Sequence, residues 1–80
     1  MLELYHFESC PCCRKVREKL EALYLSYVSH PSAWGSQKRE FLKKLMPEVQ
    51  FPLIVDSDRG VVMVESEDIC KYLEKNYGKR

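Results

Sequence analysis

The sequence lacks long hydrophobic runs and an excess of charge of one sign. Nowhere do about 18 apolar residues follow one another, and the N-terminus shows no basic leader, apolar core or small-residue cleavage site. With 13 Lys and Arg against 12 Asp and Glu, the net charge of +1 provides no long-range attraction for nucleic acid or an anionic membrane. We therefore expect a cytoplasmic protein that recognises its partners through local contacts and binds neither nucleic acid nor membrane.

Linkers, internal repeats and low-complexity segments are also absent, and the chain has only 80 residues. A chain of this length forms one small domain around a single core, so we expect one domain over residues 1–80 and a monomer. The 4 cysteines are an even number, as in a disulfide-stapled secreted domain. Because most of them crowd into one short segment, they cannot connect distant loops, and a disulfide scaffold is not expected.

The clustered cysteines form the segment Cys10-Pro11-Cys12-Cys13, which lies between a strand pattern and a helix pattern. At the first turn of a helix, unpaired backbone N–H groups and the helix dipole favour a thiolate, the species that attacks disulfides. Pro11 suits the first helical position. Cys13 follows Cys10 by about one helical turn and can attack a mixed disulfide formed there. The motif predicts a redox pair, with Cys10 as exposed nucleophile and Cys13 as sheltered resolving thiol.

The spacing of the apolar residues predicts strands and helices along the whole chain. In chain order they are a strand at 2–7, a helix from residue 11, a strand at 25–28, a helix at about 34–46, strands at 51–55 and 61–64, and a helix from residue 66 to near residue 78. Trp34, Phe41 and Leu45 form the apolar stripe of the second helix, which Pro47 ends. Ser66 is expected to cap the last helix.

The order β-α-β-α-β-β-α requires a parallel strand pair with a right-handed crossover, followed by an antiparallel hairpin. We therefore expect an α/β fold with a four-stranded mixed sheet, flanked by helices on both faces. The strand at 2–7 has large side chains on both of its faces, which is typical of a central strand. Pro52 begins a strand that otherwise looks buried, so it marks a special backbone position.

Charged residues on the first helix have two interpretations. Arg14, Lys15 and Arg17 either favour the Cys10 thiolate or are ordinary helix-surface residues, in pairs such as Arg14 with Glu18 and Arg17 with Glu21. The sequence does not decide between these two interpretations.

No metal is expected. Adjacent Cys12 and Cys13 point in different directions on a helix, so they cannot both join His6 around one ion. Cys70 and His30 occur singly, whereas a structural zinc site needs a second ligand pair at defined spacing. We expect Cys70 to be a small core residue.

Taken together, these motifs resemble the thioredoxin-fold superfamily, specifically glutaredoxins and the N-terminal domain of glutathione S-transferases. The similarity spans essentially the whole chain. Its three anchors are Ser9-Cys10-Pro11-Cys12-Cys13-Arg14 after the first strand, Val49-Gln50-Phe51-Pro52 before the third, and Glu65-Ser66 at the start of the last helix. The resemblance implies a glutaredoxin-like thioredoxin fold, with the disulfide chemistry on the C-x-x-C motif.

The resemblance also implies a glutathione site. It implies a cis Phe51–Pro52 peptide bond and a Phe51 backbone that pairs with the cysteinyl part of glutathione. Glu65 and Ser66 would bind the γ-glutamyl end, because a carboxylate suits its ammonium while a hydroxyl and helix N–H groups suit its carboxylate. The expected glutathione-binding residues are thus Pro11, Phe51, Pro52, Glu65 and Ser66, with glutathione as co-substrate.

The chain also departs from these relatives. Cys12 stands where glutaredoxins usually have Tyr or Phe, and it is a bystander, a second resolving thiol or a glutathionylation site. Phe7 stands where many glutaredoxins have a lysine, so the cation for the glycyl carboxylate is expected to be Lys38 or Arg39. Because the sequence ends at Arg80 without the helical second domain of the transferases, transferase activity on bulky electrophiles is not expected.

Three functions fit these features. The first is a glutathione-dependent thiol–disulfide oxidoreductase that reduces protein disulfides, small disulfides or mixed glutathione disulfides through Cys10 and Cys13. The second is an iron–sulfur cluster carrier, in which two chains use their Cys10 thiolates and two glutathiones. Pro11 argues against it, since cluster-binding relatives often have a less rigid residue there. The third is a non-catalytic glutathione-binding module.

Overall fold

The computed structural model describes residues 1–46 and 48–78, and its elements follow the predicted order. In chain order they are β1 (Leu2–His6), α1 (Pro11–Ala22), β2 (Val28–Pro31), α2 (Gln37–Leu45), β3 (Leu53–Asp56), β4 (Val61–Val64) and α3 (Ser66–Tyr77). The strands form a four-stranded mixed sheet in the order β2-β1-β3-β4. β1 is parallel to β2 and antiparallel to β3, and β3 pairs with β4 as an antiparallel hairpin. The predicted thioredoxin-like fold and central first strand are confirmed.

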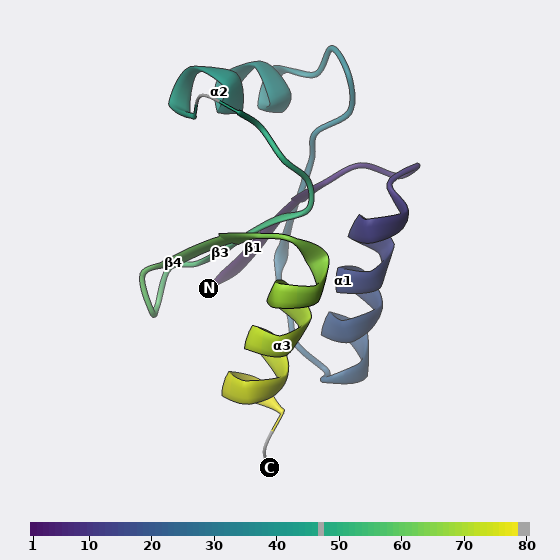
Figure 1. Cartoon of the computed structure of the whole chain (residues 1–80), viewed down its shortest axis with the longest axis vertical. Coiled ribbons are helices and arrows are strands. Elements are labelled where there is room, and N and C mark those ends of the chain that lie inside the picture. Colours follow the sequence, from purple (N-terminus) through teal and green to yellow (C-terminus); the bar gives the residue numbers. More distant parts are fainter. Residues whose placement is uncertain (47, 79–80) are drawn as a thin grey trace.

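The core lies between the sheet and two helices. α1 and α3 lie side by side on one face of the sheet, and both begin at the same end of it (Figure 1). The other helix, α2, lies on the opposite side, beyond that same end (Figure 1). The buried cluster between sheet and helices consists of Leu2, Leu4, Val16, Leu20, Ile54, Ile69 and Leu73. Its residues on the helices recur at helical spacing, which explains why the sequence predicts α1 and α3 well.

The second strand differs from its prediction. The structure places β2 at Val28–Pro31 rather than at 25–28. The pairing partner decides the position, because Val28 lies opposite Glu3 and Pro31 lies opposite His6 in the register with β1. Leu25 and Tyr27 instead pack partly buried against the core. Pro31 does not end the strand early, since a proline is tolerated at the end of an edge strand.

The second helix also differs from its prediction. It begins at Gln37 rather than near residue 34, with Ser36 as N-cap, whose Oγ accepts a hydrogen bond of 3.2 Å from the Arg39 backbone N–H. The expected apolar stripe does not face the core, since Trp34, Phe41 and Leu45 are exposed. The buried residues of α2 are Arg39 and Leu42.

The last helix begins one residue away from its predicted cap. Glu65 is the N-cap, with φ 76° and no side-chain capping hydrogen bond, and Ser66 is the first helical residue. Non-glycine residues rarely adopt such a positive φ. The unusual backbone of Glu65 therefore lies directly before Ser66, which the resemblance assigns to glutathione binding.

None of the helices within residues 1–46 and 48–78 is long and apolar enough to cross a membrane.

Candidate thiol site

Cys10 caps α1 with its sulfur. Its Sγ accepts a hydrogen bond of 3.2 Å from the Cys13 backbone N–H, in the place where a Ser or Asp oxygen usually caps a helix. Pro11 occupies the first turn, as predicted. The Cys10 N–H donates to the Phe7 carbonyl oxygen at 3.2 Å, which fixes the loop that follows β1. The Cys13 N–H and the N-terminus of α1 thus both face the Cys10 sulfur.

The three clustered thiols differ in burial. Cys12 is exposed, whereas the Cys10 residue is only 8% exposed and Cys13 is fully buried. The prediction of an exposed Cys10 is therefore wrong, because the capping geometry turns its sulfur toward the first turn of α1. Burial, and then the hydrogen bond with Cys10, raise the pKa of Cys13 to about 12. Cys13 is the sheltered thiol that the sequence predicts.

Phe51 and Pro52 lie beside the loop that carries Cys10. The Phe51–Pro52 peptide bond is cis, as the resemblance implies, and Pro52 is buried. Tyr5 of β1 lies opposite Leu53 of β3, so the chain leaving β1 and the chain entering β3 meet at one end of the sheet. The rings of Phe7 and Phe51 accordingly make an edge-to-face contact, with centroids 5.6 Å apart.

Glu65 and Ser66 reach the same end of the sheet from β4. Leu53 lies opposite Val64 in the β3–β4 register, so Pro52 and Glu65 occupy the next positions along the two strands. Ser66 is buried, whereas Glu65 is exposed. Since α1 and α3 begin at this end side by side, the N–H groups of both helix starts lie near the thiol loop (Figure 1).

An open depression of about 490 Å³ lies at the thiol loop. Its lining consists of Glu8, Ser9, Cys10, Pro11, Arg14, Lys15 and Glu18. The depression therefore gives ligands access to Cys10 from the side of the loop and α1. It includes neither Phe51 nor Ser66, which the sheet register instead brings to the same end of the molecule.

The two candidate cations of α2 lie in different surroundings. Lys38 is exposed and lines an open depression of about 530 Å³ with Ser36, Gln37 and Phe41. Arg39 turns inward, and its residue is only 6% exposed. Sequence reasoning missed this burial because a charged residue adds nothing to an apolar pattern.

A polar contact between β1 and α1 was also missed by sequence reasoning. Arg17 Nη1 donates to His6 Nδ1 at 3.3 Å, and His6 Nε2 is 2.5 Å from Ser29 Oγ. Burial, and then the charge of Arg17, lower the pKa of His6. The predicted surface pair is found for Arg14, which bonds Glu18 at 3.1 Å, whereas Arg17 bonds His6.

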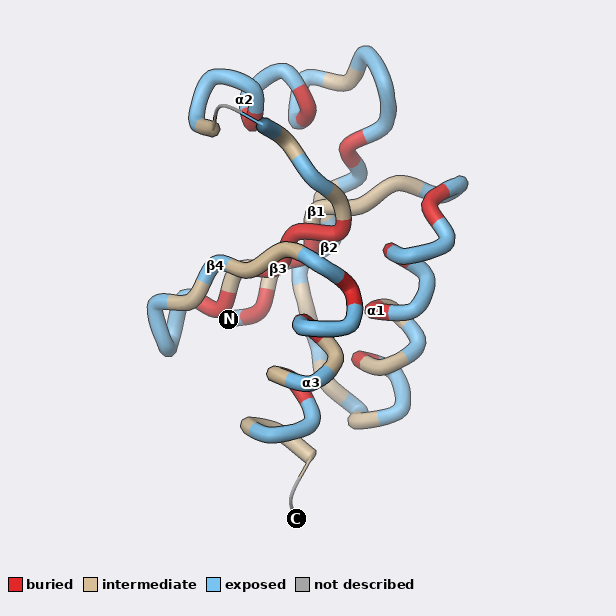
Figure 2. Tube along the Cα trace, in the orientation of Figure 1, coloured by how far each residue is buried: buried red, intermediate tan, exposed pale blue. Residues whose placement is uncertain are grey.

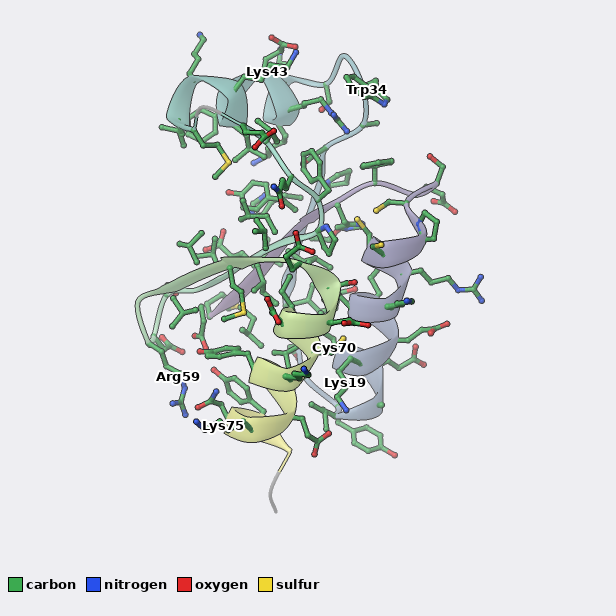
Figure 3. All side chains as sticks on the ribbon, viewed as in Figure 1. Lys19, Trp34, Lys43, Arg59, Cys70 and Lys75 are labelled. Carbon is green, nitrogen blue, oxygen red and sulfur yellow. The ribbon has the colours of Figure 1, made fainter. Side chains whose placement is uncertain are left out.

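The other residues considered as possible metal ligands do not come together in the structure. Cys70 packs partly buried against the core, on the side of α3 that faces α1 (Figure 3). Burial raises its pKa. Within residues 1–46 and 48–78, no three His, Cys, Asp or Glu side chains gather as a metal ion would require.

The fold, the cysteine-capped helix and the cis proline define a thioredoxin-fold protein of the glutaredoxin and glutathione transferase type. The family described as "Glutathione S-transferase, N-terminal domain" matches residues 4–80. The chain belongs to this family.

Similar proteins include both transferases and a glutaredoxin-like protein. An uncharacterized glutaredoxin-like 8.6 kDa protein in the rubredoxin operon of Clostridium pasteurianum is 27% identical over 75 residues, covering 94% of this chain and 100% of that protein. A glutathione S-transferase from the Antarctic clam Laternula elliptica is 32% identical over 98% of this chain, with a TM-score of 0.81. A delta-class glutathione transferase of Nilaparvata lugens is 29% identical over the whole of this chain, with a TM-score of 0.83. This chain spans 36% and 38% of the lengths of those two transferases.

Proposed function

We propose that the protein is a glutathione-dependent thiol–disulfide oxidoreductase that acts in the cytoplasm on mixed glutathione disulfides, protein disulfides and small disulfides. The observation that carries the proposal is the Cys10 sulfur, which caps α1 and accepts the Cys13 N–H at 3.2 Å. In the proposed reaction the same sulfur is the attacking group and later the leaving group, and the Cys13 N–H donates to it in both roles. The family and the glutaredoxin-like relative support glutathione as the co-substrate.

The reaction proceeds in two exchanges. The Cys10 thiolate attacks the glutathione sulfur of a mixed disulfide, forms a Cys10–glutathione disulfide and releases the substrate thiolate, which takes up a proton. A glutathione thiolate then attacks the same glutathione sulfur, yielding glutathione disulfide and the free Cys10 thiolate. The substrate sulfur is reduced to a thiol, one free glutathione is consumed, and its sulfur forms glutathione disulfide with the glutathione that the mixed disulfide supplied. A protein or small disulfide without glutathione enters by the same attack, and its mixed disulfide on Cys10 is resolved by Cys13 or by glutathione.

Glutathione itself is held by the residues at the end of the sheet. The Phe51 backbone, next to buried Pro52, pairs with the cysteinyl part, and Pro11 forms the wall beside Cys10. Glu65 and Ser66 at the start of α3 bind the γ-glutamyl end. Lys38 is the better candidate for the glycyl carboxylate, because it is exposed while the Arg39 residue is 6% exposed.

The test is a glutathione-coupled disulfide reductase assay on the wild type and on Cys10→Ser, Cys12→Ser and Cys13→Ser. Cys10→Ser is expected to abolish turnover, because no other described thiol caps a helix. Cys12→Ser is the matched control for removing a nearby thiol and is expected to retain activity. Full activity of Cys10→Ser would refute the proposal, and glutathione binding without any turnover by the wild type would favour a non-catalytic binding module.

A further inference from the structure

The attachment of α2 to the rest of the molecule depends on few residues. Its outer side is exposed, and the buried residues of the helix are Arg39 and Leu42 (Figure 2). The loop leading into α2 carries Trp34, whose residue is 77% exposed (Figure 3). Few side chains therefore hold α2 against the rest of the molecule.

Arg39 forms several of these contacts. Its Nε–H donates to the Ser32 carbonyl oxygen at 2.9 Å. Its Cζ lies 4.0 Å from the ring centroid of Trp34, 4.6 Å from that of Phe51 and 5.2 Å from that of Phe7. One guanidinium thus contacts three aromatic rings and one backbone carbonyl.

Two of these rings belong to the segments that form the thiol site. Phe7 accepts the Cys10 N–H through its carbonyl oxygen, and Phe51 precedes the cis proline. The Phe7 and Phe51 rings also contact each other. Arg39 therefore contacts both segments from α2 at once.

The chemistry of this contact requires an arginine. Within residues 1–46 and 48–78, no carboxylate lies at ion-pair distance from Arg39, so the rings and a carbonyl compensate its buried charge. A guanidinium is planar and weakly hydrated, so it stacks on ring faces. A lysine ammonium is compact and strongly hydrated, and it has no Nε–H in a position to bond Ser32.

We propose that Arg39 is a positioning residue that holds Phe51, and with it the glutathione-binding backbone, in place through this stack of rings. The inference rests on the proposed function, because it assigns Phe51 to glutathione. Arg39 acts through the rings rather than by touching the reacting sulfur atoms. Its loss should therefore affect substrate binding more than the chemical step.

The kinetic test compares Arg39→Lys and Arg39→Met with Lys43→Met, which removes an exposed cation from the same helix. With a glutathionylated peptide as substrate, both Arg39 variants are expected to raise KM about tenfold, while kcat stays within about twofold of the wild type. Lys43→Met should match the wild type. An unchanged KM in folded Arg39→Lys, or a fall in kcat alone, would overturn the proposal.

A binding test is independent of catalysis. The single tryptophan of the chain, Trp34, contacts Arg39 and reports on the stack by its fluorescence. S-methylglutathione, which cannot exchange disulfides, is expected to change this fluorescence in the wild type and to bind about tenfold more weakly to Arg39→Lys. If the wild type binds this analogue but reduces no disulfide, only the proposed function fails. If Arg39→Lys binds it as tightly as the wild type does, the role of Arg39 fails.

Discussion

At the scale of single residues, Cys10 and Cys13 are one turn apart but differ in chemistry. The Cys10 sulfur receives an N–H from the helix start, whereas Cys13 is fully buried and burial raises its pKa to about 12. At pH 7, far below this pKa, Cys13 is therefore a thiol rather than a thiolate. Free glutathione should therefore resolve the mixed disulfide on Cys10 faster than Cys13 does.

Cys13→Ser is accordingly expected to keep at least about half of the wild-type turnover of a mixed glutathione disulfide at saturating glutathione. Acid-quenched reactions of the wild type near pH 7, analysed by mass spectrometry, should contain mainly the Cys10–glutathione adduct. Raising the pH should increase the share of the Cys10–Cys13 disulfide, because Cys13 loses its proton only as the pH approaches its raised pKa. A dominant internal disulfide at neutral pH would contradict this order of reactivity.

At the scale of elements, the end of α1 contains a strained residue. Tyr24 follows the C-cap with φ 58°, and its N–H donates to Glu21 while the Leu25 N–H donates to Leu20. This pattern is a Schellman motif, in which the left-handed position usually belongs to glycine. The Tyr24 residue is 88% exposed, so little packing offsets the strain.

Tyr24→Gly is therefore expected to raise the free energy of unfolding by about 1 kcal/mol, since glycine adopts this φ without steric cost. Urea unfolding followed by circular dichroism measures the change. Tyr24→Ala keeps a Cβ and serves as the control, with no comparable gain. A glycine variant no more stable than the alanine variant would show that the backbone here is not strained.

The helices and strands also differ in how well the sequence predicts them. Elements with a buried apolar pattern begin where the sequence predicts, as in α1 with Val16 and Leu20, except that β3 begins at Leu53 rather than at residue 51. The position of β2 was not predicted correctly, because the register with β1 decides it rather than the apolar run itself. The burial of Arg39 on the inner side of α2 was not predicted either, because an arginine held by aromatic rings cannot be told from a surface residue in the sequence. Binding roles at Phe51, Glu65 and Ser66 stay predictions.

At the scale of the whole molecule, a buried carboxylate joins the sheet to the C-terminal part of α3. Asp56, the last residue of β3, is fully buried, and its Oδ2 accepts hydrogen bonds from the hydroxyls of Tyr72 and Tyr77. Oδ1 has no hydrogen-bond partner among the described residues. Burial alone would raise the pKa of Asp56, but the hydrogen bonds from Tyr77 and Tyr72, together with the charges of the N-terminus and Arg59, outweigh it and lower the pKa. Burial, and then the bond with Asp56, raise the pKa of Tyr72 to about 12.

Because the native pKa of Asp56 lies below its unfolded value of about 3.9, its charge stabilises the fold above that pH. This stabilisation is lost as the pH falls through the native pKa. Asp56→Asn is expected to lower the free energy of unfolding near neutral pH by about 1–3 kcal/mol, because an amide NH2 group, which donates hydrogen bonds, replaces one acceptor oxygen of the carboxylate in a buried site. The difference from the wild type should narrow as the pH falls below about 4, where the carboxylate takes up a proton in the unfolded wild type before it does so in the folded protein. Urea unfolding at several pH values measures this difference, with Tyr77→Phe as a control that removes one hydrogen bond and keeps the carboxylate. A difference that stays constant down to the lowest pH at which both variants fold would mean that the Asp56 charge does not stabilise the packing of α3 on the sheet.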